Sequence, residues 1–119
     1  MNVHEGPQSI SQGMPDPHTA MEESMITSIE PGLYRDGKWG IRIENLVLNV
    51  PAGNHGFGDF LQFETLTLCP IDTHLIDASL LRRDEIDWLN AYHAEVARRV
   101  SQHVSGDTLA WLLARTRAV

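Results

Sequence analysis

The stretch from residue 28 to residue 50, "SIEPGLYRDGKWGIRIENLVLNV", constrains the fold more than any other part of the sequence. The isoleucine-rich residues 25–30 and the alternating residues 40–50 are both typical of β-strands. Between them, Pro31-Gly32 favours a turn and Asp36-Gly37 favours the tip of a hairpin. We therefore expect two antiparallel strands here, joined through a short hairpin.

The rest of the chain adds one more strand and then helices. The glycine-rich "PAGNHGFGD" predicts a loop, and residues 60–71 then predict a returning strand. Residues 82–104 predict an amphipathic helix because one stripe is mostly apolar: Ile86, Leu89, His93, Val96 and Val100. Asp107, after the helix-breaking Gly106, can cap a last helix over residues 108–117. The pattern indicates an α+β fold, a curved antiparallel sheet followed by C-terminal helices.

Charge and cysteine usage narrow the function. The 119 residues carry a net charge of -7 and show no basic patch, which argues against nucleic acid and anionic membranes as partners. The single cysteine, Cys69, fits a reducing cytoplasm. We find no signal peptide in residues 1–24 and no stretch apolar enough to span a membrane.

Two glutamates are the first candidate functional residues. Glu30 and Glu44 each lie at the edge of an apolar, strand-like run, and Arg42 shares a strand face with Glu44 by the period of two. Carboxylates suit hard divalent ions such as Mn²⁺. The same pattern also fits two surface glutamates, or a Glu44 that pairs with Arg42, and the spacing alone leaves these alternatives open.

Histidines and the cysteine give weaker signals. His4, in "NVHEGP", is held against a Gly-Pro turn and is either a donor to a reacting carbonyl or an ordinary surface or capping histidine. His93 lies on the helix stripe and is expected in the core. Cys69 has no basic neighbour to activate it and is also expected to be a core residue. No spacing among the remaining histidines predicts a metal cluster: His18, His55, His74 and His103.

Four stretches, taken in order, resemble the C-terminal part of the Xaa-Pro aminopeptidase (aminopeptidase P) family: "NVHEGP", "MITSIEPGLY", "GIRIEN" and "FETLTLCPID…WLNAYH". These enzymes are pita-bread metallopeptidases that release the N-terminal residue preceding proline. The resemblance implies peptide substrates with proline in second position and two divalent metal ions, most often Mn²⁺. It also implies the C-terminal part of a pita-bread fold.

The resemblance implies a role for each matching residue. Glu30, in the Glu-Pro-Gly motif, is similar to a metal ligand that also moves a proton. Glu44 is similar to the second, bridging carboxylate. His4 is similar to a histidine that contacts the substrate near the scissile bond. Arg42 is similar to an arginine that orients active-site carboxylates.

The family pattern also implies what this chain lacks. Five ligands hold the metals in such enzymes: two aspartates, one histidine and two glutamates. The aspartates and the histidine belong before the position that Met1 matches, so three of the five are expected to be absent. Residues 1–70 then correspond to the C-terminal half of the catalytic domain, and residues 71–119 to a helical extension.

Three hypotheses follow. The first is a catalytic fragment, from a truncated gene, a split gene or a misplaced start codon, that is inactive alone and binds metal weakly or not at all. The second is a non-enzymatic module that forms a homodimer or complements a missing N-terminal half. The third is an unrelated α+β binding protein with chance motifs, which requires Glu30 and Glu44 to lie apart.

Overall fold

The computed structural model describes residues 5–10, 12–14 and 16–119. The chain divides into two compact units, Met1–Thr67 and Leu68–Val119. The strands lie in the first unit and the two α-helices in the second. The predicted α+β class is confirmed.

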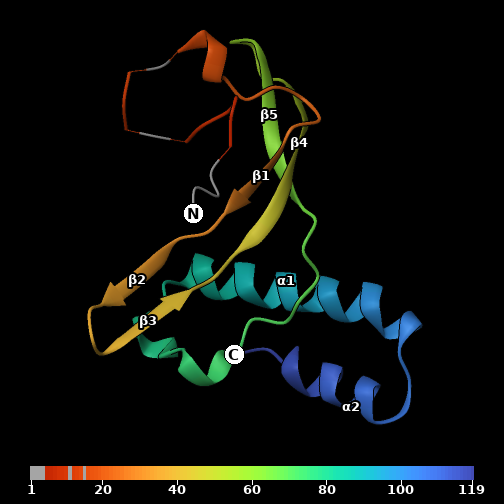
Figure 1. Cartoon of the computed structure of the whole chain (residues 1–119). Helices are drawn as coiled ribbons and strands as arrows, with labels where there is room; N and C mark the ends of the chain where they lie inside the picture. The colour runs from red at the N-terminus through yellow and green to blue at the C-terminus, as the bar shows by residue number, and fades with distance from the viewer. Residues whose placement is uncertain (1–4, 11, 15) are drawn as a thin grey trace. The chain divides into compact units, whose positions relative to one another are not determined.

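The first unit is built on antiparallel strands (Figure 1). Strands β1 (Ile26–Ile29), β4 (Asn45–Asn54) and β5 (Asp59–Thr65) form one sheet in the order β1-β4-β5. Strands β2 (Gly32–Arg35) and β3 (Trp39–Arg42) form a separate hairpin. Asp36 and Gly37 lie in its turn, as predicted, and Gly37 adopts the positive φ of 65° that the turn requires.

The two ladders share a single register. Ile29 pairs with Asn45 at the end of the β1–β4 ladder, and Gly32 pairs with Arg42 at the start of the β2–β3 ladder. Between them the Ile43 N–H donates to the Pro31 carbonyl at 3.3 Å. When the pairing of either ladder is continued into this gap, Glu30 lies directly opposite Glu44.

The predicted strand over residues 40–50 is wrong in detail, because it is interrupted at Ile43 and Glu44. The predicted loop at residue 51 is also too early, because β4 continues to Asn54. A register shift between Pro51 and Gly53 accommodates the proline, which lacks an N–H for the ladder. The loop itself is limited to residues 55–58.

Asn49 ties the segment before β1 to the central strand. Its side chain is buried, and its amide nitrogen donates to the Glu22 carbonyl at 2.8 Å. Its backbone exchanges hydrogen bonds of 2.9 Å with Ser24 and Met25. These contacts fix where β1 begins, and therefore the position of Glu30, which directly follows that strand.

The second unit packs two helices, α1 (Arg83–Val100) and α2 (Gly106–Arg115), around a small core. The buried residues Tyr92 and Val96 of α1 meet Leu112 of α2. Partly buried apolar side chains surround them: Leu68, Ile71, Val100 and Val104. Helix α1 begins where the Arg82 N–H donates to the Glu85 carboxylate at 2.8 Å. The N-cap of helix α2 is Ser105, not Asp107 as predicted.

Adjacent residues of α1 hold the incoming chain against the helix. The Tyr92 hydroxyl accepts from the Cys69 N–H at 3.3 Å and donates to the Cys69 carbonyl at 2.9 Å. The His93 Nε2 accepts from the Ile71 N–H at 3.1 Å. His93 is completely buried, as predicted. The prediction that Cys69 is a core residue is wrong, because the residue is exposed.

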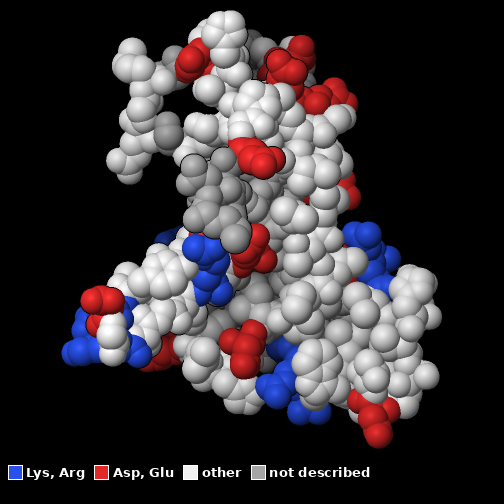
Figure 2. Space-filling model, viewed as in Figure 1, with Lys and Arg blue, Asp and Glu red and all other residues white. Residues whose placement is uncertain are grey.

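Charged side chains of both signs lie on the surface (Figure 2). Lys and Arg on the face shown lie in separate groups, with Asp and Glu between them. Among the described residues, neither helix combines the length and apolar character that crossing a membrane would require.

Candidate metal centre

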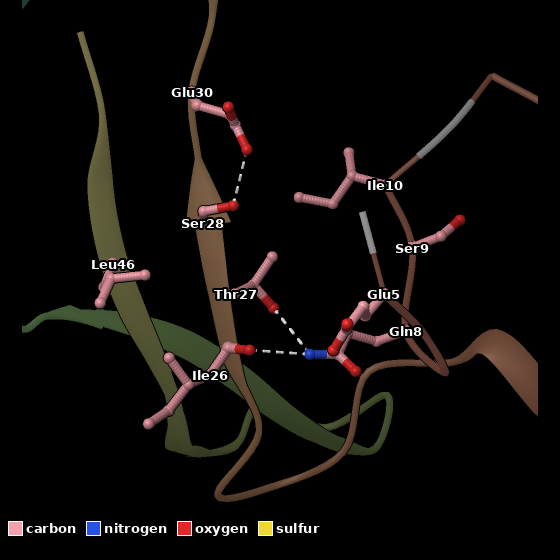
Figure 3. A pocket seen from close by; sticks show the side chains of 9 residues that line it. All are labelled: Glu5, Gln8, Ser9, Ile10, Ile26, Thr27, Ser28, Glu30 and Leu46. Carbon is pink, nitrogen blue, oxygen red and sulfur yellow. Dashed lines mark hydrogen bonds between the residues drawn. The ribbon is translucent and has the colours of Figure 1, made fainter. Parts of the chain in front are cut away.

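Glu30 lies at the end of β1, where Pro31 stops the strand. Its side chain is 22 % exposed, so its negative charge is partly removed from water and requires partners. Ser28, two residues earlier on the same strand face, donates through Oγ to Oε1 of Glu30 at 2.9 Å (Figure 3). Arg42 donates from Nη1 to Oε2 at 2.5 Å. Each carboxylate oxygen therefore has its own donor.

Tyr34 holds Arg42 from the other side. The Nε of Arg42 donates to the Tyr34 hydroxyl at 2.8 Å, and the guanidinium carbon lies 5.8 Å from the centre of the Tyr34 ring. The ring lies flat over the hairpin because Gly32 and Gly40 leave room for it. A Cβ at either glycine would stand 2.5 Å from a Tyr34 atom. The hydrogen bond with Tyr34 raises the pKa of Arg42, and the negative charges of Glu30 and Glu44 raise it further.

Glu44 faces Glu30 across the gap between the two ladders. Directly opposed residues of an antiparallel pair have Cβ atoms about 5 Å apart and point to the same face. Glu44 is exposed, and its charge acts on the Arg42 guanidinium. The ion pair of Arg42, however, is formed with Glu30. The register therefore brings two carboxylates and one arginine to one face of the strand pair.

A hollow of about 430 Å³ runs along β1 beside Glu30 (Figure 3). Its far wall is the segment of Glu5, Gln8, Ser9 and Ile10. The Gln8 amide donates to the Ile26 carbonyl at 2.8 Å and to Thr27 Oγ1 at 3.3 Å, which ties that wall to the strand. Ser28, Leu46 and Glu30 line the other side. A small polar ligand could reach the Glu30 carboxylate through this hollow.

Four site residues were predicted from the sequence: His4, Glu30, Arg42 and Glu44. Glu30 and Arg42 are in direct contact, and Glu44 is opposite Glu30 in the register. His4 lies outside the described residues. Ser28 and Tyr34 were missed, although both lie an even number of positions from Glu30, which is the spacing of one strand face. Within the part of the chain that the structure describes, no three His, Cys, Asp or Glu side chains gather closely enough to hold a metal ion.

Comparison with known protein families assigns both ends of the chain to one family. Residues 1–50 match metallopeptidase family M24, and residues 59–119 match the C-terminal region of that peptidase family. The chain belongs to the M24 metallopeptidase family. The predicted resemblance is thereby confirmed.

Curated relatives cover all or nearly all of the chain. A probable Xaa-Pro aminopeptidase P of Coprinopsis cinerea is 47 % identical over all of this chain, which covers 20 % of that protein. Aminopeptidase P2 of Arabidopsis thaliana is 49 % identical over 98 % of the chain and is covered to 17 %. The chain thus spans about a fifth of the length of the relatives it matches.

A solved M24 structure has the same fold. The X-prolyl aminopeptidase from Caenorhabditis elegans, described as a cytosolic enzyme with a di-nuclear active site, aligns with the whole chain at a TM-score of 0.83 and 41 % identity. This chain covers 20 % of it. The fold is therefore that of the C-terminal part of a pita-bread enzyme, as predicted.

Proposed function

We propose that this chain supplies two carboxylate ligands, Glu30 and Glu44, to the dinuclear metal centre of an Xaa-Pro aminopeptidase. The observation that carries the proposal is the shared register, which sets the two glutamates opposite each other on one face. The names of the relatives add the substrate class, a peptide with proline in second position.

The donor chemistry fits part of such a centre. Two hard carboxylate oxygens are suitable ligands for Mn²⁺. The described residues hold no larger cluster of metal-binding side chains, so the remaining aspartates and histidine would come from elsewhere in the enzyme. Because affinity grows with the number and charge of the ligands, the isolated chain should bind Mn²⁺ weakly or not at all and should show negligible peptidase activity.

The residues of this chain have distinct roles in the proposal. When bound, the divalent ions polarise the scissile carbonyl and make water a stronger nucleophile at neutral pH. Glu30 accepts a proton at a carboxylate oxygen and passes it to the leaving amine. Arg42 and Ser28 orient the Glu30 carboxylate, and His4 donates to the substrate carbonyl. The cytosolic relative favours the cytoplasm as the location of this activity.

A chimeric enzyme tests the proposal. The segment of the C. elegans X-prolyl aminopeptidase that aligns with this chain, 20 % of that enzyme, would be replaced by the chain. The chimera is expected to release the first residue of an Xaa-Pro peptide in the presence of Mn²⁺. Glu30→Ala and Glu44→Ala should each reduce kcat/KM by at least about a hundredfold, because a ligand is lost. Glu64→Ala removes an exposed glutamate from β5 and should leave activity unchanged.

Two outcomes would contradict the proposal. A soluble chimera that keeps its activity without Glu30 or Glu44 would show that neither is a ligand. A folded but inactive chimera would favour the alternative, a non-enzymatic interaction module. Separately, Mn²⁺-dependent activity of the unaltered 119-residue chain that is lost in its Glu44→Ala variant would contradict the expected inactivity.

A further inference from the structure

The Glu30 carboxylate is already neutralised by the chain itself. Oε2 accepts from the Arg42 guanidinium at 2.5 Å, and Oε1 accepts from the neutral Ser28 hydroxyl at 2.9 Å. The cation therefore holds one oxygen, and the weaker, neutral donor holds the other. Any divalent ion that binds Glu30 meets a positive charge that is already in contact with the ligand.

The position of Arg42 does not depend on Glu30 alone. Tyr34 accepts from its Nε at 2.8 Å and offers its ring face at 5.8 Å. The Tyr34 ring itself lies over Gly32 and Gly40, which leave room for it. Arg42 is thus anchored on the hairpin, and Glu44 lies two positions further along the same strand face. One fixed cation therefore faces both glutamates.

We propose that Arg42 is an internal counter-cation that competes with divalent ions for the glutamate pair and weakens metal binding by this chain. The inference rests on the proposed function, which makes Glu30 and Glu44 the ligands. It adds that Arg42 opposes metal entry, in addition to orienting Glu30. Repulsion between a unit charge and a divalent ion several ångströms apart, in a half-exposed setting, corresponds to roughly a tenfold change in affinity.

The inference is tested by the direction in which one substitution changes the affinity of the chain for Mn²⁺. Mn²⁺ binding to the full chain would be followed by the loss of the free-Mn²⁺ electron paramagnetic resonance signal at low ionic strength. Arg42→Gln is expected to tighten binding about tenfold. Arg42→Lys keeps the charge and should bind as the unaltered chain does. Arg35→Gln removes a charge from the same hairpin but from its opposite face, next to Trp39, and should change affinity less than about twofold.

Binding by Arg42→Gln that is unchanged, weaker or absent would overturn the inference, since the arginine would then only position Glu30. If Arg42→Gln still tightens Mn²⁺ binding in a chain that also carries Glu30→Ala, the inference is overturned as well, because the ion would then be held elsewhere. The proposed function fails by a different measurement, the activity of the chimera.

A measurement on the unaltered chain avoids dependence on the folding of variants. During titration with diamagnetic Mg²⁺, the ¹⁵N resonance of the Arg42 Nε–H should shift as the ion displaces the guanidinium from Glu30. The corresponding resonance of Arg35 should stay in place. An Arg42 resonance that does not move at millimolar Mg²⁺ would contradict the inference.

Discussion

The partner that Arg42 selects illustrates how far single residues could be predicted. The period of two correctly placed Arg42 on the same face as Glu44, but it left a pair between them open. In the structure Arg42 reaches across to Glu30 instead. Gly32, which is opposite Arg42, has no side chain to block that path. The choice depends on the cross-strand register, which residue spacing within one strand does not contain.

The glycines beneath Tyr34 lead to a prediction at this scale. Gly40→Ala places a Cβ 2.5 Å from the near side of the Tyr34 ring, so the ring must move and its bond to Arg42 must break. We expect a loss of about 0.5–1.5 kcal/mol in the free energy of unfolding, the net contribution of one hydrogen bond, measured by urea denaturation. In a Tyr34→Ala background the same change should cost much less. Equal costs in both backgrounds would show that the ring does not fill this space.

Among the secondary-structure elements, the helices were predicted better than the strands. The stripe of Leu89, His93 and Val96 marked the buried face of α1 correctly, because a periodic pattern over eighteen residues is a strong signal. The strands were harder. Nothing in "IRIENLVLNV" shows that the strand is interrupted at Ile43 and Glu44. Nor did a proline with a nearby glycine indicate that β4 continues through a bulge.

Two adjacent leucines of α2 offer a matched pair for testing its packing. Leu112 is 3 % exposed in the helical core, whereas Leu113 is 48 % exposed. Leu112→Ala should lower the free energy of unfolding by about 2–5 kcal/mol, because it removes contacts and leaves a cavity. Leu113→Ala should change it by less than about 0.5 kcal/mol. Chemical denaturation of the full chain measures both, and similar losses would mean that α2 packs through a different face.

At the scale of the whole molecule, the family motifs carried most of the prediction. Four short motifs in the right order indicated the family, and the α+β class followed from the strand and helix patterns. The contacts around Glu30 could not be predicted in the same way, because the motifs do not encode which side chains donate to its two carboxylate oxygens. The partners of Glu30 had to be found in the structure.

Acid should destabilise the helical unit. Hydrogen bonds with His74, Ser79, Arg82 and Arg98 lower the pKa values of Asp72, Asp77, Asp84 and Glu95, all in Leu68–Val119. Their ordinary values are 3.8 for aspartate and 4.5 for glutamate. The unfolded chain therefore binds protons first as the pH falls, so the stability that these groups contribute is present above about pH 4.5 and is lost below it.

Urea midpoints of the full chain, measured from pH 6 down to pH 2.5, should thus decline below about pH 4.5. The double variant Asp84→Asn, Glu95→Gln should start from a lower midpoint at pH 6 and decline less steeply. A midpoint that stays constant or rises in acid would contradict the assignment of these carboxylates as stabilising.

The register shared by the two ladders has a practical consequence for anyone who modifies this chain. A single residue inserted in either arm between Glu30 and Glu44 would turn one glutamate to the opposite face, unless a bulge absorbed it. The turn at Asp36–Lys38 is different, because extra residues there lengthen only the loop and leave the pairing of Arg35 with Trp39 intact. The hairpin tip is therefore the position at which an epitope tag or a fluorescent reporter could be inserted without separating the two carboxylates.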